Sequence, residues 1–82
     1  MTTLNIEVRF FAALRERLGE GVRRDVPRGT TLAVLWRELA AATPGLEALP
    51  VRFAVRERYV EPSYVLRQGD EVAVFPPVSG GA

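Results

Sequence analysis

The sequence predicts an α+β fold, in which a mixed sheet carries one main helix packed on one of its faces. Three observations support this prediction. An alternating apolar segment stands near the start of the chain, an apolar helical stripe occupies the middle, and a short apolar strand pattern lies close to the end. With 82 residues, the chain is expected to form one small domain around one core.

The first strand is expected over residues 4–10, where apolar and polar residues alternate with period two. This pattern is typical of a strand with one buried face. The spacing then becomes helical at Phe11, Leu14 and Leu18, and Gly19 follows as a helix stop. A short helix is therefore predicted to leave the first strand directly at Phe11.

The main helix is predicted from an apolar stripe over residues 32–39. Thr30 or Thr31 offers an N-cap immediately before it, and Thr43-Pro44-Gly45 stops it. Trp36 lies on the apolar stripe, so it is expected to pack in the core and not to serve as a binding platform.

Three further strands are expected to complete the sheet. A weak one covers residues 22–26, a third covers residues 51–55, and the last covers residues 71–75. This order of strands and helices fits a β-grasp arrangement, in which the first and last strands pair at the centre. The predicted domain spans residues 1–75, and residues 76–82 are expected to form a flexible carrier tail.

Composition narrows the class of protein. Apolar residues make up 48% of the chain and charged residues 26%, which is ordinary for a soluble globular fold. No apolar run approaches the roughly 20 residues of a membrane span, and a basic, then apolar, secretory leader is not recognised. We therefore expect a cytoplasmic protein that binds no membrane.

Three residue types are missing altogether: Cys, His and Lys. No thiol nucleophile, persulfide or His-containing triad can form on this chain, and the carboxylates show no metal-ligand spacing. The eleven basic residues are scattered arginines and the net charge is +1, so no nucleic-acid partner and no bound metal are expected. We therefore expect no catalysis by side chains of this chain.

The end of the sequence is the most informative segment, because its chemistry is almost entirely that of backbone. It reads Phe75-Pro76-Pro77-Val78-Ser79-Gly80-Gly81-Ala82. The two prolines end the last strand, and the small residues that follow add little side chain. This composition suits a carrier whose working group is a terminal carboxyl that enters the active site of another protein. A frayed tail is the alternative.

Three segments together resemble the small, sulfur-carrying subunits of molybdopterin synthase, a family of ubiquitin-like sulfur carriers. They are residues 10–16 (FFAALRE) followed by Gly19, residues 69–73 (GDEVA) and residues 75–81 (FPPVSGG). The likeness covers nearly the whole chain. It implies the ubiquitin-like β-grasp fold, in agreement with the order of predicted elements.

The resemblance also implies a function. An E1-like enzyme would use ATP to adenylate the carboxylate of Gly81, and a donor such as a cysteine desulfurase would supply sulfur to form a thiocarboxylate. The tail would then enter the large synthase subunit, where the sulfur passes to a pterin precursor. The chain itself would bind no cofactor and act as a non-catalytic, sulfur-donating subunit. The tail residues concerned are Pro76, Pro77, Val78, Ser79 and Gly80.

An exposed apolar patch near the base of the tail should bind the partners. By resemblance we place this patch at Phe11, Tyr59 and Phe75. Phe75 is out of phase with Val72 and Val74, which favours a ring that faces a partner. For Phe11 and Tyr59 the pattern leaves core packing equally open.

The sequence departs from the family in two places. Relatives often carry Asn where this chain has Arg56 after Val55, and Asn suits a left-handed turn better than Arg, so a different local turn is expected. The other departure is Ala82, which follows the working Gly81. Removal of Ala82 by a peptidase is the favoured explanation; activation of Ala82 itself and an inactive copy are the alternatives.

Other functions remain open at this point. The same carrier chemistry could serve thiamin synthesis, thiolation of a tRNA base or a tungsten-pterin pathway. A glycine tail also permits a ubiquitin-like modifier that is joined to lysines of other proteins. A plain interaction domain with an inert tail is the fourth possibility.

Overall fold

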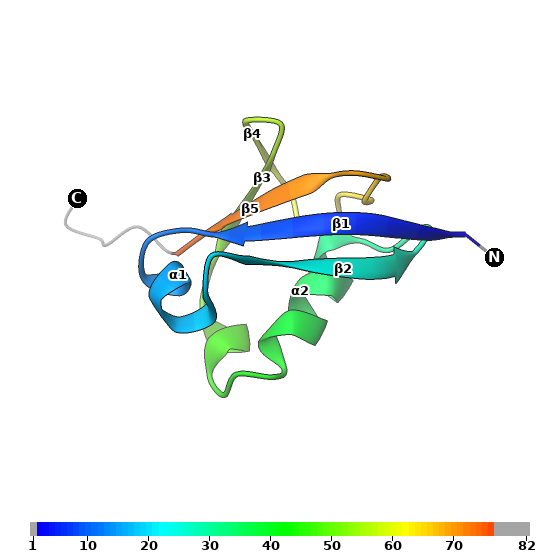
Figure 1. Cartoon of the computed structure of the whole chain (residues 1–82). Helices are drawn as coiled ribbons and strands as arrows, with labels where there is room; N and C mark the ends of the chain where they lie inside the picture. The colour runs from blue at the N-terminus through cyan, green and yellow to red at the C-terminus, as the bar shows by residue number, and fades with distance from the viewer. Residues whose placement is uncertain (1, 77–82) are drawn as a thin grey trace.

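A computed structural model describes residues 2–76 of the chain. Five strands form one mixed sheet, and helix α2 packs against one of its faces (Figure 1). The strands are β1 (Thr3–Phe10), β2 (Gly21–Pro27), β3 (Arg52–Val55), β4 (Arg58–Val60) and β5 (Glu71–Phe75). The helices are α1 (Ala13–Leu18), α2 (Leu32–Ala40) and the short 3₁₀ helix η1 (Leu46–Ala48).

The strand that leads to the tail is the middle one. The strand order is β2-β1-β5-β3-β4, with β5 parallel to β1 and antiparallel to β3. The predicted central pairing of the first and last strands is therefore confirmed, as is the β-grasp order of elements. Because β5 has a hydrogen-bonded neighbour on each side, its last residue, Phe75, is held in a fixed position and direction.

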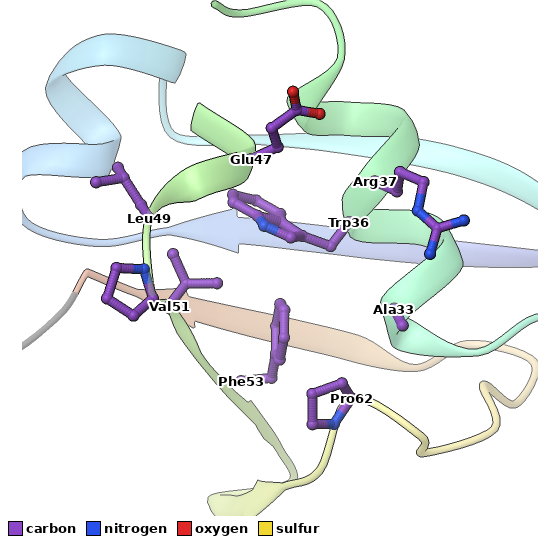
Figure 2. Close-up of a pocket in the computed structure, with 9 residues that line it drawn as sticks. Ala33, Trp36, Arg37, Glu47, Leu49, Val51, Phe53 and Pro62 are labelled. Carbon is purple, nitrogen blue, oxygen red and sulfur yellow. The ribbon is translucent and has the colours of Figure 1, made fainter. Parts of the chain in front are cut away.

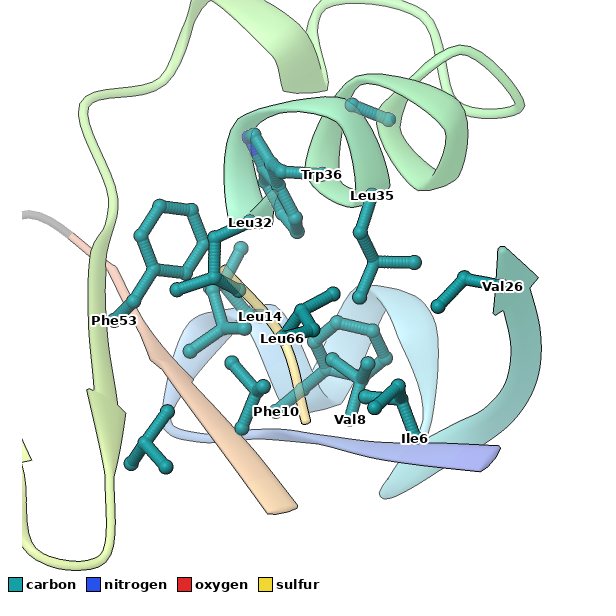
Figure 3. Packing of buried hydrophobic residues seen from close by; sticks show 14 of the residues in the cluster. Ile6, Val8, Phe10, Leu14, Val26, Leu32, Leu35, Trp36, Phe53 and Leu66 are labelled. Carbon is teal, nitrogen blue, oxygen red and sulfur yellow. The ribbon is translucent and has the colours of Figure 1, made fainter. Parts of the chain in front are cut away.

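The core lies between the sheet and α2 (Figure 3). Alternate residues of β1 point into it, as the period-two pattern predicted, and they meet Leu32, Leu35 and Trp36 of α2. Trp36 is buried and packs edge to face on Phe53, with 6.0 Å between ring centroids. The prediction that Trp36 is a core residue is confirmed.

The N-terminus of α2 is capped as the sequence predicted. The Thr31 side-chain oxygen accepts a hydrogen bond from the Val34 amide at 3.4 Å. Thr30 instead donates its hydroxyl to the Pro27 carbonyl at 2.6 Å, which closes the turn after β2. Of the two candidate caps, Thr31 is therefore the one that serves α2.

The predicted start of α1 at Phe11 is wrong, because α1 begins at Ala13. The Phe11 amide donates to the Val74 carbonyl at 3.2 Å, so Phe11 extends the pairing with β5 and lies outside the helix. Gly19 does end α1, as expected: its amide bonds to the Arg15 carbonyl at 2.9 Å, and its φ is 92°.

The sequence analysis did not define β4 or η1. β4 forms a hairpin with β3 through the two residues Arg56 and Glu57, whose φ values are 51° and 66°. Two left-handed residues in a two-residue loop match the twist of antiparallel strands. The turn therefore remains left-handed although Arg56 occupies it, and the expectation of a different local turn is wrong.

Within residues 2–76, neither α-helix has the length and apolar character needed to cross a membrane.

Candidate functional site at the base of the tail

Three aromatic side chains line up at the end of β5, where the chain leaves the sheet. The rings of Phe11 and Phe75 are stacked, with centroids 4.9 Å apart and planes 16° from parallel. The Tyr59 ring meets Phe75 edge to face, with centroids 6.2 Å apart. We call Phe11, Phe75 and Tyr59 the aromatic row. It crosses the sheet face opposite α2, and both pair geometries are those that aromatic rings favour.

The alternation of the strands places these rings outside the core. Val72 and Val74 are buried, so Phe75 projects from the other face of β5, where it is half-buried. Phe11 follows the buried Phe10 and is 36% exposed, and Tyr59 is 67% exposed. The structure thus brings the three predicted interface residues together and leaves each of them accessible.

An arginine closes the row at one end. The Arg52 guanidinium lies 5.8 Å from the centroid of the Tyr59 ring, within cation–π range. Arg52 is the register partner of Phe75 in the β3–β5 ladder, so it lies directly beside the point where β5 ends. The sequence analysis did not single out this arginine, because its place depends on the pairing of two distant segments.

Beside the row, the outer face of the sheet is hollowed. Small residues, Ala54 on β3 and Ala73 on β5, are register partners there, and Phe11 and Phe75 form part of the rim. Arg9 and Glu71 make an ion pair at 3.1 Å across β1 and β5, and both side chains are about half exposed. A pair this exposed adds little to stability. Together with Arg56 and Glu57, it gives the hollow a charged border beside the apolar rim of Phe11 and Phe75.

A buried carboxylate fixes the start of β5. Asp70 is 2% exposed and accepts three hydrogen bonds: from Arg56 Nη1 at 2.8 Å, from the Tyr64 hydroxyl at 2.8 Å and from the Arg67 amide at 2.9 Å. The bond to Asp70 and a second one to Tyr64 raise the pKa of the Arg56 guanidinium. The hairpin turn and the turn before β5 are thereby joined.

The Asp70 network was missed at the level of sequence, where Asp70 appeared only within the GDEVA segment. A carboxylate that immediately precedes an apolar strand was the available signal. Its partner Arg56 is 14 residues away, and nothing in the local pattern indicates the pairing. The function of the network is positional: β5 is held at both ends, by Asp70 at its start and by the aromatic row at its end.

A second hollow lies on the side of the sheet that α2 covers. Figure 2 shows the Trp36 and Phe53 side chains pointing toward one another in its lining, with Arg37 and Glu47 at its border. Its lining is mostly apolar and includes Pro62, while the three aromatic-row residues lie elsewhere. Within the described part of the chain, no three acidic residues lie close enough together to hold a metal ion.

Of the predicted tail residues, the structure describes Pro76, which is half-buried. The remaining predicted tail residues lie outside the described part of the chain. These residues are Pro77, Val78, Ser79, Gly80, Gly81 and Ala82. Their proposed roles stay predictions.

Comparisons with known proteins agree on a family. The model of the ThiS family matches residues 8–81. The molybdopterin synthase sulfur carrier subunit of Homo sapiens is 42% identical in an alignment of 84 positions that covers 93% of this chain and 93% of the human protein. The matched region contains the aromatic row and the glycine pair of the tail.

Solved structures agree on the fold. A putative molybdopterin converting factor, subunit 1, from Pyrococcus furiosus superposes with a TM-score of 0.80 at 28% identity, covering 92% of this chain and 99% of that one. The small archaeal modifier protein 1 of H. volcanii gives 0.78 at 28% identity, with the same coverage. A ubiquitin from Caldiarchaeum subterraneum gives 0.67 at 15% identity over 98% and 100% of the two chains, which shows a shared fold.

One of the similar structures is an assembly. It is a complex of subunits 1 and 2 of the molybdopterin-converting factor from Helicobacter pylori; its matching chain gives a TM-score of 0.63 at 26% identity, over 95% of this chain and 100% of that one. The fold of the present chain is therefore the ubiquitin-like β-grasp, and a protein of similar sequence and fold forms a complex with a second subunit.

Proposed function

Because the chain belongs to the ThiS family, we propose that it is a sulfur carrier and serves as the small subunit of a molybdopterin synthase. The names of its relatives and the structure of a two-subunit complex support this role. One structural observation carries the proposal furthest: the segment ending in Gly80-Gly81 follows directly from β5, the middle strand of the sheet.

A central strand is the best support for a tail that must reach a distant active site. β5 pairs with both β1 and β3, and Asp70 fixes its start. A tail that leaves a fixed point in a fixed direction loses less conformational freedom when it enters a partner than one that leaves a mobile point. Residues 76–81, fully extended, reach about 20 Å.

The proposed reaction takes place at the carboxylate of Gly81 and needs no side chain of this chain. A carboxylate oxygen attacks the α-phosphorus of ATP in an E1-like enzyme, and pyrophosphate leaves. A persulfide sulfur, supplied by a donor such as a cysteine desulfurase, then attacks the acyl carbon and AMP leaves, which gives an acyl disulfide. A thiol of a partner or of the medium reduces the S–S bond, is itself oxidised to a disulfide, and frees the thiocarboxylate. The chain has neither Cys nor His, so the acid–base and thiol groups belong to its partners.

Gly81 has a free carboxylate only after the Gly81–Ala82 peptide bond is hydrolysed. We include this cleavage, by a peptidase, in the proposed sequence of events, which would take place in the cytoplasm. It precedes adenylation because an amide carbonyl cannot attack ATP as a carboxylate does.

The aromatic row is the proposed contact with the large synthase subunit. Phe11, Phe75 and Tyr59 are exposed or half-buried, Phe75 packs against each of the other two, and the row lies at the end of β5, where the tail begins. Aromatic residues dominate the binding energy of protein interfaces, and a cluster of them on a small soluble domain indicates a binding surface.

The thiocarboxylate is tested by intact mass. A chain that ends at Gly81 is incubated with the E1-like enzyme, ATP and a sulfur source, and we expect the mass gain of one oxygen-to-sulfur exchange. A chain that ends at Ser79 keeps the domain and loses the glycine pair, so it should gain nothing. If the Gly81 chain also gains nothing, the carrier proposal fails.

The recipient of the sulfur is tested separately. If the chain serves molybdopterin synthesis, it should form a stable complex with the large synthase subunit encoded by the same organism. A chain that acquires sulfur but forms no such complex would instead serve thiamin synthesis, tRNA thiolation or a tungsten-pterin pathway.

A second function is favoured by one specific observation, the TM-score of 0.78 to small archaeal modifier protein 1. A protein modifier would form an isopeptide bond from Gly81 to lysines of other proteins. Conjugates of higher mass in cells, which disappear when Gly81 is deleted, would support this function. Recovery of the free chain alone would count against it.

A further inference from the structure

We propose that Ala12 is a positioning residue, whose unusual backbone conformation holds the Phe11 ring in the aromatic row. Ala12 lies between β1 and α1 with φ at 54° and ψ at −132°. A side chain with a Cβ atom rarely adopts a positive φ, and glycine is the ordinary residue in such a place. The conformation is strained and persists only where the surroundings enforce it.

Hydrogen bonds fix the chain on both sides of Ala12. Before it, the Phe11 amide donates to the Val74 carbonyl at 3.2 Å. After it, the Ala12 carbonyl accepts from the Arg15 amide at 3.0 Å, and the Phe11 carbonyl accepts from the Leu14 amide at 3.1 Å. The corner is therefore tied to β5 on one side and to the first turn of α1 on the other.

Burial of the neighbouring side chains explains why the chain turns so tightly at Ala12, between β1 and α1. Phe10 is 3% exposed and Leu14 is 1% exposed, so both point into the core. Between them, the Phe11 ring lies on the opposite face, against Phe75. The chain must reverse the direction of its side chains within two residues, and the positive φ of Ala12 achieves this.

A residue at position 12 that cannot adopt a positive φ should disrupt the weaker of the two segments that flank it, the Phe11 side or the Leu14 side. Leu14 is almost fully buried, whereas Phe11 is 36% exposed and held by one amide bond to β5. We therefore expect the Phe11 side to give way, which separates its ring from Phe75. The position of the ring follows from the structure alone; its consequence for partner binding rests on the proposed function.

Three variants of the full chain test the proposal. Ala12→Val adds a β-branched side chain at the positive φ, Ala12→Gly accepts that φ without strain, and Ala13→Val makes the same change at the neighbouring exposed position, which has a negative φ. The readouts are the melting temperature and the NMR shifts of the Phe75 ring protons, which the stacked Phe11 ring displaces.

Ala12→Val should lose the displaced ring-proton shifts and melt roughly 5 to 20 °C below Ala13→Val. Ala12→Gly and Ala13→Val should keep the shifts. If Ala12→Val keeps them, or if Ala12→Val and Ala13→Val melt together, Ala12 does not position the ring and the proposal is overturned.

A fourth variant covers the case in which Ala12→Val does not fold. Chemical synthesis with the D-enantiomer of alanine at position 12 keeps every atom and makes a positive φ the favoured one, because the allowed regions of a D-residue are mirrored. This chain should melt above the natural one and keep the ring-proton shifts. A lower melting temperature would overturn the proposal.

Affinity for the large synthase subunit separates this proposal from the proposed function. Ala12→Val should weaken binding about tenfold or more if the row is the interface, because a displaced ring no longer contributes to it. If the ring moves and binding does not change, the positioning role stands and the proposed interface is wrong.

Discussion

At the scale of single residues, Tyr59 offers the clearest test of the aromatic row. It is 67% exposed, so truncation should hardly affect folding, yet aromatic residues at interfaces commonly contribute about 2 kcal/mol or more to binding. We expect Tyr59→Ala to weaken binding of the large synthase subunit by at least about tenfold, as measured by calorimetry.

Val65→Ala is the matched control, because Val65 is also exposed, at 51%, and is not part of the row. It should leave the affinity unchanged. Equal affinities for Tyr59→Ala and Val65→Ala would remove Tyr59 from the interface.

Asp70 is the residue whose loss should most disturb the start of β5. Asp70→Asn replaces a buried acceptor by a group that also donates, opposite Arg56, the Tyr64 hydroxyl and the Arg67 amide, all of which donate. We expect a loss of about 2 to 3 kcal/mol in the free energy of unfolding, measured in urea.

The exposed ion pair of Arg9 and Glu71 provides the control for the stability of Asp70→Asn. Glu71→Gln removes the charge that pairs with Arg9, whose side chain is about half exposed like that of Glu71, and should change stability by less than about 1 kcal/mol. If both variants lose the same stability, the burial of Asp70 has no special importance.

At the scale of elements, the close approach of β1 and β2 depends on Gly21. A Cβ atom at Gly21 would lie 2.5 Å from the Val8 carbonyl oxygen, which is backbone and cannot move aside alone. Gly21→Ala should therefore cost about 1 to 3 kcal/mol of stability and speed hydrogen exchange at the amides shared by β1 and β2.

Arg23→Ala, on the same strand, replaces an exposed side chain and should leave exchange nearly unchanged. If hydrogen exchange in Gly21→Ala is faster by the same factor in all five strands, the effect is not local to β1 and β2.

The sequence was most reliable where an element is long and strongly periodic. The alternation of β1, the stripe of α2 and the apolar run of β5 all predicted the observed elements, because each pattern reports one buried face. β4 was missed because its three residues follow a turn of Arg56 and Glu57, which carries none of the usual Asn-Gly or Gly signals.

The start of α1 was wrong for a tertiary reason. Phe11 fits the helical spacing, but its amide is taken by the Val74 carbonyl, 63 residues later in the chain, and no local pattern reports such a bond. The site shows the same limit of local sequence patterns. The alternation of side chains along β5 was enough to predict that Phe75 points outward. The stack of Phe75 with Phe11 depends on the parallel pairing of β1 and β5, which no local pattern reports.

At the scale of the whole molecule, the proposed function makes the chain a platform for one end of its own backbone. Strands β1 and β3 hold β5 from both sides, the aromatic row lies at the end of β5, and the side chains supply neither thiol nor imidazole. In the proposed function, the chemistry therefore belongs to Gly81 and to the partners, and the fold presents Gly81 to them.

Single-turnover transfer tests this assignment most directly. The chain ending at Gly81, loaded with sulfur, is mixed with the large synthase subunit and the pterin precursor, and its mass is followed as product forms. The account predicts that the thiocarboxylate returns to a carboxylate as the dithiolene appears, with two chains consumed for each product because each carries one sulfur. A thiocarboxylate that persists while product forms, or no product despite a stable complex, would contradict it.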